Sequence, residues 1–352
     1  MEYKQINTAT QNRLHYIDVA KGVAIILVVL HHDILGTYAS SHGTNMTASM
    51  LQDAQYYWLV PYFMPVFFML TGYCSNFGKS LKPFTTSLLL SIGLPIFFFD
   101  IIPYNIELYL ALPFNEWLCQ IPSSLLRFVR YSYWFLRALF VAKLLYWGIS
   151  RVCSGVKKSI VVVVLYVVAC TAVLLGHGEH GCHSLIAMMY IGIGEICKKR
   201  NIFEDRKGLG LWATLLYILV TIFLVCLSRK APYMANDIQI ADFLDVMLMP
   251  ILAISGSVAI ICLAKCISEN KVLEYFGRYS IVIYCIHMHP YLGQIYKSIL
   301  GYCGIYIDFP NADATSTIAY VISFLIFSLC MCSLFAYIID RPYLRVIMGK
   351  RP

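Results

Sequence analysis

The sequence predicts an all-α membrane protein, a polytopic bundle of about ten transmembrane helices with both ends in the cytoplasm. Hydrophobic residues make up 59% of the 352 residues and charged residues only 13%. The mean hydropathy is +0.69. A soluble globular protein carries roughly 25% charged residues, so this chain has too little charge to cover soluble domains of its size. The excess of apolar side chains needs lipid as its solvent.

Apolar segments follow one another along the whole chain, most of them near the roughly 20 residues that a membrane span requires. The segment 183–197 is short, and 132–150 contains Arg137 and Lys143. Asp18 and Lys21 at the start of the first segment, with nine more segments behind it, argue against a cleaved signal peptide. We expect one membrane-embedded domain over 1–352, with 1–16 and 340–352 cytoplasmic. The ten segments are 17–36, 57–74, 84–103, 132–150, 159–176, 183–197, 209–228, 244–267, 279–300 and 316–339.

Basic residues set the expected orientation, because cytoplasmic loops of membrane proteins are enriched in Lys and Arg. With the N-terminus inside, 20 of the 27 basic residues lie on the inner side and only 4 on the outer side. This enrichment accounts for the net charge of +8, and no basic run interleaved with aromatic residues suggests nucleic acid as a partner. The long outer stretch 104–131 is expected to lie on the membrane or to re-enter it.

The first span carries a polar stripe, formed by Asp18, Lys21 and His32. Each residue of a helix turns about 100° and rises about 1.5 Å. Lys21 and His32 therefore lie about 20° apart, and His32 lies about 16.5 Å deeper, near the middle of the ~30 Å hydrocarbon core. His31 lies about 80° from the Lys21 direction and is expected to point elsewhere. Ionisable groups in a span are usually functional and face the bundle interior, although a histidine satisfied by a neighbouring helix is the alternative.

A second intramembrane histidine lies in the ninth segment. Ser280, Tyr284 and His287 are spaced to share one helix face. Counted from Arg278, His287 lies about 13.5 Å deep, close to the depth of His32. We expect His287 either to line the same cavity as His32 or to make a packing contact.

Two further polar features are less specific. Arg137 lies in the outer half of its span and is expected to line a polar cavity wall, with Asp33 as a candidate partner. The outer stretch containing His177, His180 and His183 has metal-ligand residue types, but its spacing is not that of a familiar zinc site. A polar outer turn is the favoured interpretation, and no metal site is predicted.

Several pieces of the chain, taken in order, resemble the acyltransferase-3 family of membrane proteins, and most closely the members grouped with fucose 4-O-acetylase. Lys21, in place of a family Arg, is followed by ten residues and then His32, and the run 63–73 ends in Thr71-Gly72-Tyr73 in place of Ser-Gly-Tyr. Neither departure removes the charge or the hydroxyl group. Two further pieces are Tyr133-Trp134-Phe135-Leu136 and the segment 276–287, and together the pieces cover nearly the whole chain.

The resemblance implies transfer of an acyl group, usually acetyl, from cytoplasmic acyl-CoA to a hydroxyl of a sugar or cell-surface glycan. It implies a multi-pass protein of a bacterial inner or plasma membrane that modifies polysaccharide by O-acetylation. Acyl-CoA is the expected donor substrate, no bound cofactor is predicted, and membrane lipid and the glycan acceptor are the other partners.

The resemblance and the polar faces together predict the site residues. His32 and His287 are the expected catalytic residues, and Lys21 and Asp18 are expected to bind the donor. The expected substrate cavity consists of Thr71, Tyr133, Trp134, Arg137, Ser280 and Tyr284.

The chemistry of an imidazole leaves two routes open. His32 can take the proton of the attacking hydroxyl group, a contribution of typically 10²–10⁴-fold, or it can carry the acyl group itself. A transporter or flippase for a glycan precursor is the alternative function. That class is typically built from inverted repeats or paired broken helices, and the sequence shows neither.

Overall fold

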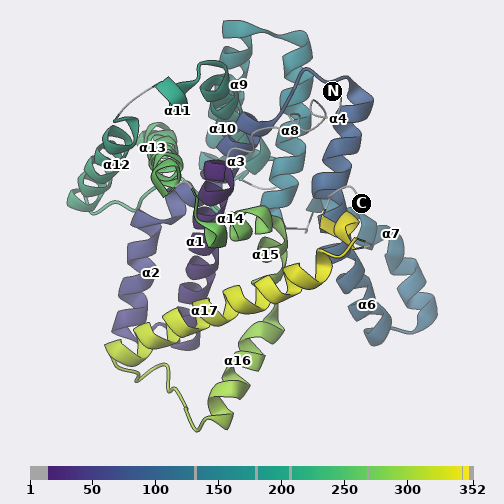
Figure 1. The fold of residues 1–352 in the computed structure, drawn as a ribbon, viewed down its shortest axis with the longest axis vertical. Coiled ribbons are helices and arrows are strands. Elements are labelled where there is room, and N and C mark those ends of the chain that lie inside the picture. Colours follow the sequence, from purple (N-terminus) through teal and green to yellow (C-terminus); the bar gives the residue numbers. More distant parts are fainter. Residues whose placement is uncertain are drawn as a thin grey trace, which may run out of the picture.

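The computed structural model describes residues 15–130, 133–178, 181–205, 208–267, 269–342 and 344–348. It confirms the predicted all-α helix bundle (Figure 1). The only strands among the described residues form a two-stranded antiparallel hairpin, β1 (Tyr233–Met234) and β2 (Ile238–Gln239).

The helices of the first half begin with α1 (His15–Ser40), α2 (Met46–Trp58) and α3 (Val60–Cys74). One long helix follows, made of α4 (Leu81–Leu88), the π-helical η1 (Leu89–Gly93), α5 (Leu94–Ile96), the π-helical η2 (Phe97–Ile101) and α6 (Ile102–Ala111). After it come α7 (Phe114–Arg130), α8 (Trp134–Val152) and α9 (Gly155–Leu174).

The second half contains α10 (Cys182–Lys199), α11 (Ile202–Asp205), α12 (Leu209–Cys226) and α13 (Phe243–Ile267). The chain then forms α14 (Lys271–Arg278), α15 (Ser280–Ile286), α16 (Pro290–Tyr302), α17 (Ala314–Ile339) and the short 3₁₀ helix η3 (Arg345–Met348).

Within the described part of the chain, six helices are long and apolar enough to cross a membrane: α1, the long helix 81–111, α9, α12, α13 and α17. The pair α2–α3, bent by 41°, makes a seventh if it is counted as one span. The predicted fourth and sixth spans are helical, as α8 and α10, but fall outside this set. The count of ten spans and the orientation stay predictions.

Two boundary predictions were wrong. The ninth segment, 279–300, is not one helix: α15 ends at Ile286 and α16 starts at Pro290. Proline has no N–H and clashes with the preceding turn, so a helix breaks before it. The third span does not end at 103 but continues to Ala111, and α7 then folds back to form a helical hairpin that projects from the bundle (Figure 1).

Two helix pairs approach each other so closely that only glycine fits at the contact. A Cβ added to Gly277 of α14 would lie 1.8 Å from the carbonyl oxygen of Asp18, and one on Gly22 of α1 would lie 2.0 Å from that of Leu273. The same occurs between α3 and α10, at Gly72 and Gly194. Small residues at helix interfaces allow this close packing in membranes. These contacts fix α1 against α14 and α3 against α10.

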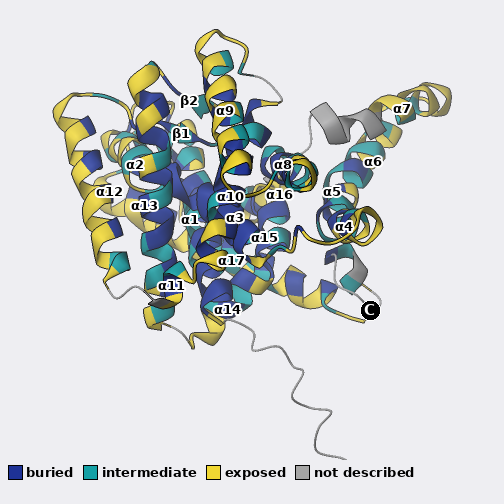
Figure 2. Cartoon of the chain, turned by 90° about the horizontal axis from the view of Figure 1, so that it is seen from above, coloured by how far each residue is buried: buried dark blue, intermediate teal, exposed yellow. Residues whose placement is uncertain are grey.

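The burial pattern is that of a bundle with lipid around it. Buried residues concentrate in α1, α3 and α10 at the centre, while outer helices such as α12 expose one side (Figure 2). Trp212 and Leu219 of α12 are 71% and 68% exposed although they are apolar. In a bilayer such faces contact acyl chains.

The loop between α12 and α13 packs on α2 and α3. Its hairpin stacks Tyr233 on Tyr56 of α2, with ring centroids 5.1 Å apart. Arg229 donates to the carboxylates of Asp242 and Asp245, at 2.7 and 3.0 Å, and this contact holds the pKa of Asp242 below its usual value. The loop is thereby fastened to the start of α13.

We expect Gly277→Ala to destabilise the protein, because the new methyl group would collide with the backbone of α1. Overpacking of this kind costs typically 1–3 kcal/mol. Gly36→Ala is the matched control, since a Cβ on this α1 residue has nothing within 4 Å. Thermal unfolding of both variants in detergent should show a lower midpoint for Gly277→Ala alone. Equal midpoints would contradict the close contact.

Candidate active site

Two histidines from distant parts of the chain meet inside the bundle. The Nε2 of His287, at the end of α15, lies 3.2 Å from the Nδ1 of His32 on α1. The two ring centroids are 4.8 Å apart. His287 is only 5% exposed, and His32 is half-buried. The two residues that the sequence predicted to be catalytic thus form one histidine pair.

Backbone carbonyls fix which ring nitrogens carry hydrogen. The Nδ1 of His32 faces the carbonyl of Val28 at 2.9 Å, and the Nδ1 of His287 faces that of Tyr284 at 2.9 Å. A carbonyl oxygen can only accept, so both Nδ1 atoms are assigned as donors. The Nε2 of His287 then accepts from His32, and the Nε2 of His32 keeps its lone pair. The pair therefore presents one basic nitrogen.

His31 points elsewhere than the histidine pair, as its position on the helix predicted, with its Nδ1 2.9 Å from the Oε1 of Gln55. However, it is buried at 4% exposure, because α2 and α3 cover that side of α1. Its ring centroid is 4.9 Å from that of His32. The helical angle predicted the direction of His31 but not the helices packed there.

The N-terminal part of the polar stripe opens into a cavity of about 600 Å³, called here the large cavity. Asp18 and Lys21 of α1, Thr71 of α3 and Ser280 of α15 line it together. Sequence reasoning did not assign three further charged residues of its wall, Arg278, Asp340 and Arg345. The close contact of α1 with α14 brings these groups into one place.

A second cavity of about 260 Å³ shares Lys21 and Thr71 with the large cavity. Lys79, from the loop after α3, and Lys143 of α8 also line it, so we call it the lysine cavity. None of the described residues that line it is acidic. Its other polar groups come from Ser75, Asn76 and Ser87. The sequence offered one signal for it, a lysine within the apolar segment 132–150.

Aromatic residues connect the large cavity to the histidine pair. Phe67 and Phe135 line the cavity, with ring centroids 5.7 Å apart. Phe135 lies 5.3 Å from Tyr284, whose ring lies 5.9 Å from that of His287. An apolar aromatic segment therefore separates the large cavity from the imidazoles.

Four of the predicted substrate-cavity residues line neither cavity: Tyr133, Trp134, Arg137 and Tyr284. Tyr133 donates to the carbonyls of Phe99 and Cys285, at 3.1 and 2.8 Å, and so ties η2 to α15. Trp134 packs on His183, with ring centroids 5.2 Å apart. Arg137 lies within electrostatic range of Tyr284 and His183.

The predicted pairing of Arg137 with Asp33 is wrong. The Oδ2 of Asp33 is buried without a hydrogen-bond partner, and no ion pair joins the two residues among those described. As for the outer histidine stretch, His183 faces the carbonyl of Ala235 through its Nε2, at 3.1 Å. His180 lies outside the described residues.

Comparison with known proteins identifies the class of this site. The acyltransferase domain family matches residues 14–337, which include every residue of the two cavities except Asp340 and Arg345. The chain belongs to the acyltransferase-3 family. No curated protein and no solved structure gives a significant match. The histidine pair and the cavities therefore belong to a membrane acyltransferase.

The rates at which charged thiol reagents modify a cysteine should show whether the lysine cavity of this acyltransferase is cationic. Cys74 lines the cavity and is exposed. A negatively charged thiol reagent should modify a variant that retains only Cys74 faster than a positively charged reagent does, because a cationic recess concentrates anions. The ratio of the two rates should fall in Lys143→Gln. A variant that retains only Cys303, an exposed cysteine that lines neither cavity, is the control, and an equal ratio at both cysteines would contradict a cationic cavity.

Proposed function

We propose that the protein is an integral membrane O-acyltransferase that moves an acyl group, acetyl in the simplest case, from cytoplasmic acyl-CoA to a hydroxyl of a sugar or cell-surface glycan. The observation that carries the proposal is the link between two unlike features. The lysine cavity is cationic and adjoins the large cavity. Aromatic residues lead from the large cavity to a histidine pair with one basic nitrogen.

The charge of the expected donor is complementary to that of the lysine cavity. Coenzyme A carries a diphosphate and a 3′-phosphate, and three lysines in a cavity whose described lining has no acidic residue favour such a polyanion. We place the phosphates in the lysine cavity, next to Lys21, Lys79 and Lys143. The adjoining large cavity then holds the arm that carries the thioester, beside the hydroxyl groups of Thr71 and Ser280.

The transfer step uses the lone pair on the Nε2 of His32. In one route Nε2 takes the proton of the acceptor hydroxyl while its oxygen attacks the thioester carbon. The carbon–sulfur bond breaks, and the coenzyme thiolate leaves and takes the proton back. In the other route Nε2 attacks the thioester carbon first, the carbon–sulfur bond breaks, and the coenzyme leaves as a thiolate. The acceptor oxygen then attacks the acyl carbon and gives its proton to the thiolate, and the carbon–nitrogen bond breaks, which returns the lone pair to Nε2. Single-turnover trapping of an acyl-histidine separates the two routes.

His287 acts as a positioning residue in this proposal. Its Nε2 accepts from the Nδ1–H of His32, which holds that imidazole in the tautomer with a free Nε2. When the Nε2 of His32 takes a proton, the ring becomes positive, and a nearby acceptor stabilises it. The acceptor sugar approaches from the outer side, where Arg137 and Tyr284 supply polar groups close to the pair.

We expect His32→Ala to lower acyl transfer by about 10²–10⁴-fold, the range for loss of a general base. His289→Ala is the matched control, because this exposed histidine stacks on Tyr291 two residues beyond the pair. Release of free coenzyme A from labelled acetyl-CoA, with a glycan acceptor present, measures the rate. If His32→Ala turns over like the wild type with an unchanged unfolding profile, the catalytic assignment is wrong.

We expect Lys21→Ala and Lys143→Ala each to raise the KM for acyl-CoA while kcat changes little, because lost uniform binding acts on KM alone. Lys21→Arg should keep the charge and most of the activity. Steady-state kinetics over a range of acyl-CoA concentrations measures both constants. A fall in kcat at constant KM would instead place the lysine at the transition state.

A further inference from the structure

A third cavity, of about 320 Å³, opens between α8, α9 and α10. It shares no residue with the large cavity or the lysine cavity. We call it the α9–α10 groove. Its wall combines charged residues at the ends of the helices, Lys158, Glu195, Lys199 and Arg200, with a set of apolar residues deeper in. This arrangement is separate from the proposed donor site and needs its own explanation.

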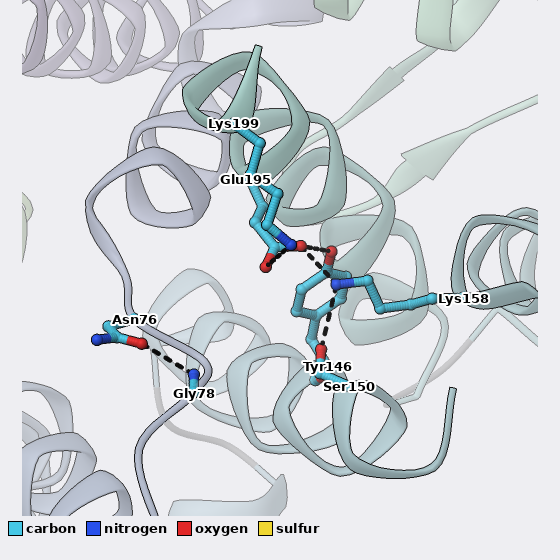
Figure 3. A network of polar contacts seen from close by, with 7 residues as sticks. All are labelled: Asn76, Gly78, Tyr146, Ser150, Lys158, Glu195 and Lys199. Carbon is cyan, nitrogen blue, oxygen red and sulfur yellow. Dashed lines mark hydrogen bonds and ion pairs between the residues drawn. The ribbon is translucent and has the colours of Figure 1, made fainter. Parts of the chain in front are cut away.

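A buried carboxylate organises the charged end of the groove. The Oε2 of Glu195 accepts from the Nζ of Lys158 at 2.5 Å and from the hydroxyl of Tyr146 at 2.7 Å (Figure 3). Lys199 approaches the other oxygen, Oε1, at 3.0 Å. Lys158 and Glu195 are both buried, so their charges neutralise each other inside the protein.

Positive charge remains at the rim after this neutralisation. Lys199 is 64% exposed in its side chain, and Arg200 at the end of α10 is also exposed. Lys158 and Lys199 both contact the single carboxylate of the groove, and Arg200 is a third cation, so the lining keeps a net charge of +2. An anion of charge −1 or −2 therefore complements the rim.

The rest of the groove is apolar and runs along the helices. Val163 lies five residues beyond Lys158, and Met189 lies eleven residues before Arg200. At 1.5 Å per residue these positions are about 7.5 Å and 16.5 Å from the basic rim. Val162 and Ile193 fill the wall between them. A free phosphate or a soluble nucleotide would use the rim and leave this apolar length empty.

We propose that the α9–α10 groove binds one anionic phospholipid. Its phosphate lies at Lys199 and Arg200, and one acyl chain follows the apolar wall toward Met189. Basic pockets between transmembrane helices at the cytoplasmic side are suited to such headgroups. The buried Glu195 keeps Lys158 from contributing a third charge and fixes α9 against α10, so the groove keeps its shape.

The test measures lipid binding to the delipidated full-length protein in detergent by native mass spectrometry. Phosphatidylglycerol should bind at one site, and phosphatidylcholine should bind at least ten-fold more weakly. Removal of one basic residue by Arg200→Ala should weaken phosphatidylglycerol binding about five-fold, and the double variant Lys199→Ala with Arg200→Ala about 30-fold. Lys198→Ala is the matched control, because this exposed lysine is adjacent but does not line the groove.

A second pair of variants tests the acyl chain without changing charge. Val163 lines the groove and is 50% exposed, whereas its neighbour Val164 is 53% exposed and does not line it. Val163→Trp should reduce binding of phosphatidylglycerol, and Val164→Trp should not. Equal affinity for the two lipids, or competition by glycerol phosphate as strong as by intact lipid, would overturn the proposal. So would unchanged binding in both Arg200→Ala and Val163→Trp.

Discussion

The arrangement of the site depends on the backbone contact between α1 and α14. Because Gly22 and Gly277 have no side chains, the start of α1 lies directly against α14, and Arg278 and Ser280 follow within three residues of the contact. That contact places Lys21 opposite the end of α14 in one cavity. It also starts α15 beside α1, so His287 reaches His32. A larger residue at either glycine would separate the two polar faces.

The hydrocarbon core imposes the second constraint, since polar groups there must be satisfied within the protein. His32 and His287 meet it by donating to carbonyls of their own helices, and His287 also accepts from His32. Each ring is thus held at Nδ1 by a local contact that any helical histidine can make. The arrangement leaves the Nε2 of His32 as the one imidazole nitrogen of the pair without a polar contact in this set, which is what a base or an acyl carrier requires.

Local periodicity predicted the features that lie within one helix. The stripe from Lys21 to His32 and the face from Ser280 to His287 follow from the helical repeat alone. What periodicity does not contain is the neighbour: Gln55 beside His31 and Lys79 beside Lys21 come from other segments. Pro290 is a residue that interrupts helices, but the apolar residues on both sides of it favoured the prediction of one continuous span. Contacts between helices therefore account for most of the differences between the predicted site and the observed one.

The lysine cavity and the α9–α10 groove differ in how the charge of a lysine side chain is balanced. In the α9–α10 groove Lys158 faces Glu195, so its charge is balanced by the protein itself. No carboxylate among the described residues pairs with Lys143 of α8. Burying an unbalanced charge costs free energy, and a ligand that supplies the missing negative charge offsets that cost. In the proposed function a polyanionic donor supplies this charge in the lysine cavity, whereas in the groove the protein itself supplies one carboxylate.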